Sequence, residues 1–128
     1  MPYRLVDGVN DYGIRVSTHV LYNDWDWVGN GSTPLYKLPY IILSSVKSIN
    51  ELNNLSAVLG DLYASPSLVD NDYVLQFLIT DGTSTYVIAP PKSSSGSYLI
   101  IDATDQPKLA NFRWINEYRI NDRTDSRL

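Results

Sequence analysis

The sequence predicts an α+β fold in which a mostly antiparallel sheet packs against two helices. A run of alternating apolar and polar residues near the N-terminus indicates a first strand. Apolar residues at helical spacing follow it and indicate two helices, and four further strand patterns then alternate with turn residues. The order of one strand, two helices and four strands is typical of an α+β domain.

The first strand is predicted over residues 14–22, where Ile14, Val16 and Thr18 alternate with polar neighbours. The pairs Asp7-Gly8 and Tyr12-Gly13 come before it, and both indicate turns, since glycine adopts positive φ without a Cβ clash.

Two helices are predicted after a polar loop that carries Trp25 and Trp27. The first spans residues 35–46, with Pro39 in its first turns, where proline is best tolerated. The second begins at a capping box formed by Ser48 and Glu51 and is expected to continue to about Tyr63.

The remaining chain predicts four strands. The first two form a hairpin around Asp81-Gly82, and the Pro90-Pro91 pair prevents further ladder pairing after the second. The four predicted strands span residues 73–80, 85–89, 98–101 and 108–112.

Composition narrows the function classes. The 128 residues predict a single domain over 1–128, either complete or a piece of a larger protein. A net charge of −4 disfavours a nucleic-acid partner, which needs a clustered basic surface. The longest apolar run, residues 38–43, is too short to span a membrane. No signal segment is visible, so a complete chain is expected to be cytoplasmic, whereas the compartment of a fragment is undetermined.

The titratable and nucleophilic residues also limit which catalytic or metal-binding functions the chain can have. The chain has no cysteine, and hence no thiolate nucleophile, disulfide or sulfur metal ligand. The single histidine, His19, lacks partners at metal-binding spacing, so no metal and no cofactor are expected. Asp102 and Asp105 suit a hard cation, although a solvated turn explains them better.

Several segments, in their order along the chain, resemble the choloylglycine hydrolase family of linear amide C–N hydrolases, which includes bile-salt hydrolases and penicillin V acylases. The first is Asp7-Gly-Val-Asn-Asp-Tyr-Gly-Ile14, and the second is the proline-containing helix followed by the Ser48–Glu51 cap. The third is the predicted hairpin over residues 77–88, and the last is Leu109-Ala110-Asn111.

The resemblance implies part of the αββα N-terminal-nucleophile fold. In that family an N-terminal cysteine attacks a small amide substrate, and its own α-amine acts as the base. Asn111 corresponds to the family's asparagine that donates to the oxyanion. Trp25 and Trp27 are candidate substrate contacts.

Two departures from the family limit what this chain is expected to do. The nucleophilic cysteine would lie before residue 1, and Val20 occupies a position where relatives have a side-chain donor. The sequence therefore predicts an internal fragment that is inactive as it stands. A fragment that exposes one sheet face is also expected to self-associate.

Each candidate site residue also has a structural explanation. Asn111 also suits the capping of a strand end, and the two tryptophans also suit the anchoring of a loop over the helices. A different class of function remains open as well: a non-catalytic binding or assembly domain. Ten tyrosines and three tryptophans in the chain favour it, since such side chains are common at interfaces.

Overall fold

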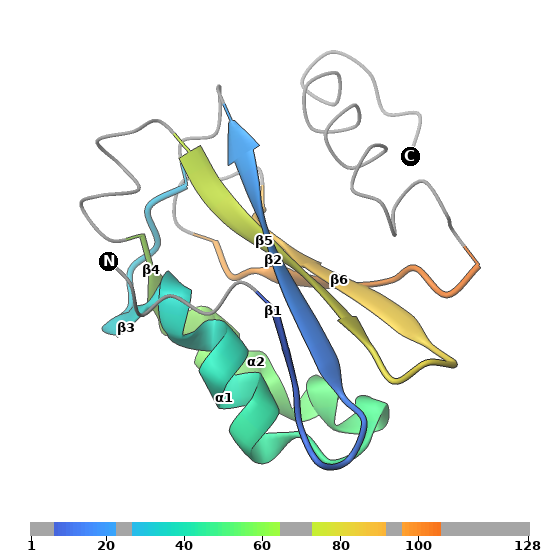
Figure 1. The fold of residues 1–128 in the computed structure, drawn as a ribbon. Helices are drawn as coiled ribbons and strands as arrows, with labels where there is room; N and C mark the ends of the chain where they lie inside the picture. The colour runs from blue at the N-terminus through green and yellow to red at the C-terminus, as the bar shows by residue number, and fades with distance from the viewer. Residues whose placement is uncertain (1–6, 23–26, 65–72, 92–95, 106–128) are drawn as a thin grey trace.

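The computed structural model describes residues 7–22, 27–64, 73–91 and 96–105 (Figure 1). Within these ranges one sheet contains five strands in the order β1-β2-β5-β6-β7, and every neighbouring pair is antiparallel. The strands are β1 (Asp7–Val9), β2 (Arg15–Tyr22), β5 (Tyr73–Thr80), β6 (Thr85–Ala89) and β7 (Leu99–Asp102). The predicted α+β class with a mostly antiparallel sheet and two helices is confirmed.

The helices lie together on one side of the sheet (Figure 1). A 3₁₀ turn over Leu35–Lys37 leads into α1 (Leu38–Ser45), and Pro39 occupies the first turn of this helix, as predicted. Proline fits there because the first helical N–H groups have no intrahelical acceptor.

The second helical segment differs from the prediction. It is a 3₁₀ helix over Ile49–Leu55 followed by a short α2 (Ser56–Gly60), and it ends before Tyr63. Ile49, Leu52 and Leu55 are all buried, and their spacing of three residues matches the three-residue turn of a 3₁₀ helix. Leu62–Tyr63 instead forms β4, which pairs in parallel with β3 (Thr33–Pro34).

One predicted turn is a strand in the structure. Asp7-Gly8 was expected to be a turn, but both residues belong to β1, where Gly8 pairs with Val16 of β2. Asp and Gly disfavour strands, so this edge strand depends on its partner. The second predicted turn is confirmed, with Gly13 at a φ of 84° between the two strands.

The predicted hairpin of β5 and β6 is confirmed with its bounds unchanged. Thr80 pairs with Thr85 across the connection, and Gly82 has a φ of 92°. The predicted strand at residues 108–112 lies outside the described residues.

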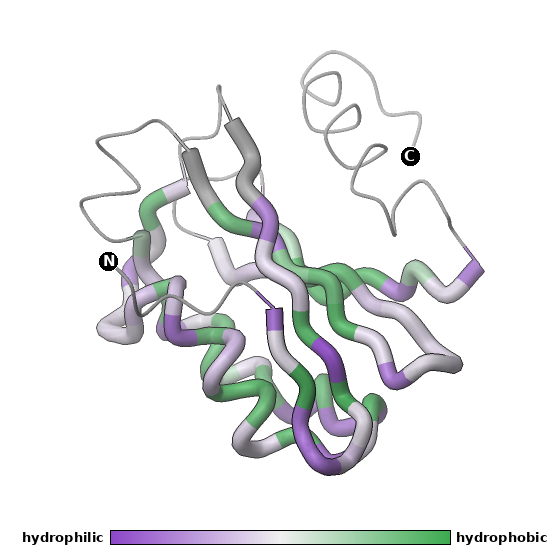
Figure 2. The backbone as a smooth tube through the Cα atoms, in the orientation of Figure 1, coloured by the Kyte–Doolittle hydropathy of each residue, from purple (hydrophilic) through white to green (hydrophobic). Residues whose placement is uncertain are grey.

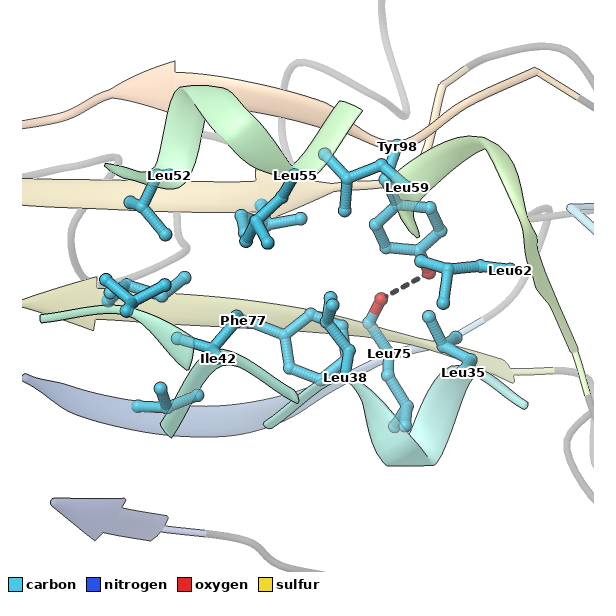
Figure 3. Packing of buried hydrophobic residues seen from close by; sticks show 14 of the residues in the cluster. Leu35, Leu38, Ile42, Leu52, Leu55, Leu59, Leu62, Leu75, Phe77 and Tyr98 are labelled. Atoms are coloured by element: carbon cyan, nitrogen blue, oxygen red, sulfur yellow. Dashed lines mark hydrogen bonds between the residues drawn. The ribbon is translucent and has the colours of Figure 1, made fainter. Parts of the chain in front are cut away.

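The main core fills the space between the helices and one face of the sheet (Figure 3). Figure 2 shows apolar stretches along the helices and β5, and a hydrophilic turn between β1 and β2. The helices contribute Leu38, Ile42 and Leu52, while Phe77 and Ile79 point in from β5, all at most 1% exposed. Each such side chain removed from water contributes roughly 1.5–3 kcal/mol of hydrophobic stabilisation.

Candidate functional site

Two of the three predicted site residues, Asn111 and Trp25, lie outside the described residues. Their roles as oxyanion donor and substrate contact therefore stay predictions. The described residues contain the third, Trp27, together with the segments that carry most of the family resemblance.

Trp27 lies in the main core and is 3% exposed. Its indole Nε1 donates a hydrogen bond to the carbonyl oxygen of Gly96 at 2.7 Å, and its ring meets Tyr98 edge to face at 4.7 Å. The Tyr98 hydroxyl donates to the Leu75 carbonyl oxygen at 2.6 Å, the contact drawn as a dashed line in Figure 3. These contacts fit the structural alternative, in which Trp27 anchors its loop, and its role as a substrate contact stays a prediction.

Asn10 joins the turn between β1 and β2 to helix α1. Its Oδ1 accepts hydrogen bonds from the backbone N–H groups of Tyr12 at 2.9 Å and Ile14 at 3.0 Å. Its Nδ2 donates to the carbonyl oxygens of Leu43 at 3.1 Å and Val46 at 2.7 Å.

The two ends of the Asn10 amide therefore act on different elements. The bonds of Oδ1 hold the turn, which is the role that the Asp/Asn-Gly chemistry of this segment predicts. The bonds of Nδ2 satisfy carbonyls at the end of α1, where the last C=O groups have no intrahelical donor. The sequence carries no signal for this second role, since the partners lie more than 30 residues away.

A second polar cluster joins α2 to the start of β3. The Asp61 carboxylate accepts from the Thr33 hydroxyl at 2.7 Å and from the backbone N–H of Ser32 at 3.1 Å. These hydrogen bonds hold the pKa of Asp61 below its ordinary value, the Thr33 hydroxyl contributing most. Gly31 passes so close to the Asp61 backbone that a Cβ at this position would overlap it.

Polar residues of β1, β2 and β5 lie on the sheet face opposite the helices. Arg15 Nη1 lies 4.0 Å from Asp7 Oδ2 in an exposed ion pair. His19 pairs with Gln76 across the strands, and partial burial lowers the His19 pKa while the Asp7 charge opposes the shift. Gln76 is 1% exposed, and its Oε1 has no hydrogen-bond partner within the part of the chain that the structure describes.

Asp102, one of the two residues suited to a cation, takes part in a turn. Its Oδ1 accepts from the backbone N–H of Thr104 at 3.0 Å, and this bond lowers the Asp102 pKa. Across the described ranges, no three histidine or acidic side chains cluster in a way that could hold a metal ion. The same ranges contain no helix with the length and apolar character needed to cross a membrane.

The arrangement of Asn10, Trp27 and Asp61 is that of a scaffold. Each side chain bonds backbone or side-chain groups of a distant segment and so fixes one element against another. Rigid supports of this kind hold loops and strand ends, which is where reactive groups are placed in many folds.

Comparison with known proteins gives distant similarities to solved structures alone. No family model matches the chain, and no curated protein matches it in sequence. Among solved structures, the chain is similar to an arginine-to-leucine variant of conjugated bile acid hydrolase from Clostridium perfringens, with a TM-score of 0.49 and 18% identity. The match covers 77% of this chain but 31% of that chain, so this chain spans less than a third of the hydrolase's length.

Proposed function

We propose that this chain is the sheet-and-helix portion of a linear amide C–N hydrolase of the choloylglycine hydrolase type. We also propose that the 128-residue chain has no amidase activity by itself. In this proposal the described residues form the support for a reactive centre that other parts of the protein complete.

The observation that carries the proposal is the connection made by Asn10. This residue belongs to the segment Asp7–Ile14, whose sequence resembles the family motif, and its four hydrogen bonds tie the motif's turn to α1. The second and third resembling segments also fall on regular elements. The cap at Ser48 and Glu51 begins a helix, and residues 77–88 form most of a hairpin.

The chemistry assigned to the complete enzyme is acyl transfer to a cysteine followed by hydrolysis of the thioester. The oxyanion formed in each step needs a preorganised donor, and an asparagine NH₂ at a strand end provides one. We assign that role to Asn111 and a substrate contact to Trp25. For Trp27, burial against Tyr98 supports the anchoring role over direct contact with a substrate.

The proposed inactivity of the isolated chain follows from the missing nucleophile. None of the 128 residues is a cysteine, so no thioester can form. An asparagine donor and a binding surface are not enough, because the thioester pathway needs a nucleophile.

An activity assay tests this first prediction. We expect the purified chain to release no measurable glycine or taurine from conjugated bile salts and no phenoxyacetate from penicillin V. The Asn111→Ala variant serves as the matched control and is expected to behave identically. Turnover by the unmodified chain that Asn111→Ala abolishes would contradict the proposed inactivity.

The assignment to an amidase is tested separately by the DNA that flanks the coding sequence. We expect a reading frame upstream that encodes a cysteine able to become N-terminal, followed by about 80 residues, the extent that the family resemblance implies. Flanking DNA that encodes only unrelated proteins would contradict the assignment.

A non-catalytic binding domain is the alternative, and two exposed tyrosines favour it. Tyr12 is 59% exposed and Tyr40 is 44% exposed, and the Lys47 ammonium lies 5.7 Å from the Tyr12 ring centroid. The burial of Trp27 and Tyr98 removes two other aromatic side chains from this surface. Partner binding that is lost in Tyr12→Ser and Tyr40→Ser, but kept in Asn54→Ser, would favour the alternative.

A further inference from the structure

The loop that leads into β3 contains the one asparagine of this chain that is followed by glycine, Asn30-Gly31. Asparagine is among the chemically labile residues of proteins. Its side-chain carbonyl carbon lies within reach of the next backbone nitrogen, and a glycine that follows has no Cβ to hinder the approach. Asn30 is exposed, so water reaches its side-chain amide. The local sequence therefore favours a reaction between these two residues.

Contacts with the start of β4 hold the backbone nitrogen of Gly31. Its N–H donates to the Leu62 carbonyl oxygen at 3.3 Å, which is longer than an ordinary N–H···O bond. The main chain of Gly31 also lies so close to the Asp61 backbone that a Cβ would overlap it. An attacking nitrogen must lose its proton and turn toward the Asn30 side chain, so both contacts oppose the reaction.

The residues that follow Gly31 are held to Asp61 as well. The Thr33 N–H donates to the Asp61 carbonyl oxygen at 2.8 Å, and the Thr33 hydroxyl donates to the Asp61 carboxylate at 2.7 Å. The Ser32 N–H donates to the same carboxylate at 3.1 Å. β3 and β4 lie side by side and pair over only two residues each (Figure 1). So short a pair of strands opens at low cost in free energy.

We propose that Asn30 is a modification site whose spontaneous conversion is controlled by the β3–β4 pair. When the pair opens, the Gly31 nitrogen attacks the Asn30 Cγ, and a C–N bond forms while the bond from Cγ to Nδ2 breaks. The Gly31 proton and the side-chain NH₂ leave together as ammonia, and a cyclic imide remains. Water then opens the imide at either carbonyl and gives aspartate or isoaspartate. The inference does not depend on the proposed amidase function.

The isoaspartate product is expected to keep the β3–β4 pair from closing again. Its main chain runs through the former side chain, which adds one CH₂ between residue 30 and Gly31. The close approach of Gly31 to the Asp61 backbone leaves no space for that displacement. The conversion therefore acts as a one-way switch that fixes the pair in its open state.

Peptide mass spectrometry of the full-length chain, incubated at mildly alkaline pH, measures the reaction. The peptide that contains Asn30 is analysed for the imide, for aspartate and for isoaspartate at each time point. Asn54 is the internal control, since it is also exposed but precedes a leucine, whose side chain hinders the attack. Asn30→Gln is the variant control, because its longer side chain closes the ring poorly.

We expect conversion at Asn30 to be about tenfold slower in the folded chain than in guanidinium chloride, because the rate follows the fraction of open pairs. Asp61→Ala removes the carboxylate that holds Ser32 and Thr33, and it should raise the rate in the folded chain. Thr33→Val removes one of these bonds and is the second test if Asp61→Ala does not fold. Asp81→Ala is the matched control, since that carboxylate accepts backbone N–H groups in a different turn, and it should leave the rate unchanged.

Equal rates in the folded and unfolded chains would overturn the control by the β3–β4 pair, as would equal acceleration by Asp61→Ala and Asp81→Ala. An Asn30 that stays unconverted in the folded chain and in both variants would overturn the modification site itself. Amide hydrogen exchange tests the one-way switch. The Thr33 N–H should lose its protection in the isoaspartate product and keep it in Asn30→Asp, which adds the charge without the CH₂, and unchanged protection in the isoaspartate product would overturn the switch.

Discussion

At the scale of single residues, Asn10 shows how one side chain can serve two elements. The amide group has an acceptor and two donor hydrogens, so it can bind N–H groups on one side and carbonyls on the other. Asp has the same shape but lacks the donors, and Ser is shorter. The geometry at Asn10 therefore requires asparagine, although a turn alone accepts several residue types.

Replacing Asn10 is expected to destabilise the fold more than replacing an exposed asparagine. Asn10→Ala removes four hydrogen bonds in a partly buried place, and we expect the free energy of unfolding to fall by roughly 2–4 kcal/mol. Asn54→Ala, on the exposed side of the second helical segment, is the control and should change it by less than about 0.5 kcal/mol. Urea unfolding curves measure both, and equal effects of the two variants would contradict the role given to Asn10.

At the scale of elements, some helices and strands form because of their local sequence, and others form only because a distant segment pairs with them. The β5–β6 hairpin and the capping box at Ser48 and Glu51 form as predicted, because turn residues and caps act over three or four positions. The Glu51 carboxylate accepts from the backbone N–H groups of Lys47 at 2.6 Å and Ser48 at 3.1 Å. The strands β3 and β4 could not be predicted in this way, since they pair residues 29 apart.

Two glycines, Gly13 and Gly29, have similar backbone conformations but different surroundings. Gly13 and Gly29 both have positive φ, at 84° and 74°. A Cβ on Gly13 would meet nothing within 4 Å, whereas one on Gly29 would overlap the Leu62 carbonyl oxygen and lie 2.8 Å from the Trp27 ring.

Alanine at these two glycines separates backbone strain from packing. We expect Gly13→Ala to cost about 1 kcal/mol for the left-handed conformation. Gly29→Ala should cost a further 1–3 kcal/mol or so, because Trp27 and β4 must move. Thermal unfolding with calorimetry measures the difference, and equal costs would show that the contact of Gly29 with Trp27 and Leu62 does not constrain the fold.

At the scale of the whole molecule, the pKa values of five titratable groups are shifted in the same direction. Hydrogen bonds from backbone and hydroxyl groups lower the pKa values of four carboxylates, Glu51, Asp61, Asp81 and Asp102. Partial burial lowers the His19 pKa as well. In every case the unfolded chain binds protons more readily than the folded chain does.

Stability is therefore expected to fall as the pH is lowered, in two stages. The His19 contribution is complete above pH 6.5 and is lost as the pH falls from there through the lowered folded pKa. The carboxylate contributions are complete above their ordinary pKa values of 4.5 for Glu and 3.8 for Asp, and are lost below them. Urea unfolding at pH 7.5, 5.5 and 3.5 measures both stages.

The control for the upper stage is His19→Gln, which should remove the loss between pH 7.5 and 5.5 and leave the acid stage in place. A stability that rises between pH 7.5 and 5.5 in the unmodified chain would contradict the direction assigned to His19.

The sequence by itself determined the class of the fold and the elements whose signals are local. Helix α1, the cap at Ser48, and the strands β5 and β6 depend on periodicity, turn chemistry and side chains within a few positions. Only the tertiary structure decided that Asp7-Gly8 is an edge strand, that the second helical segment stops at Gly60, and that Trp27 lies in the core. The physical reason is range: each of these outcomes is fixed by a partner that the chain brings close only when it folds, whereas caps and turns are fixed by neighbours that are always near.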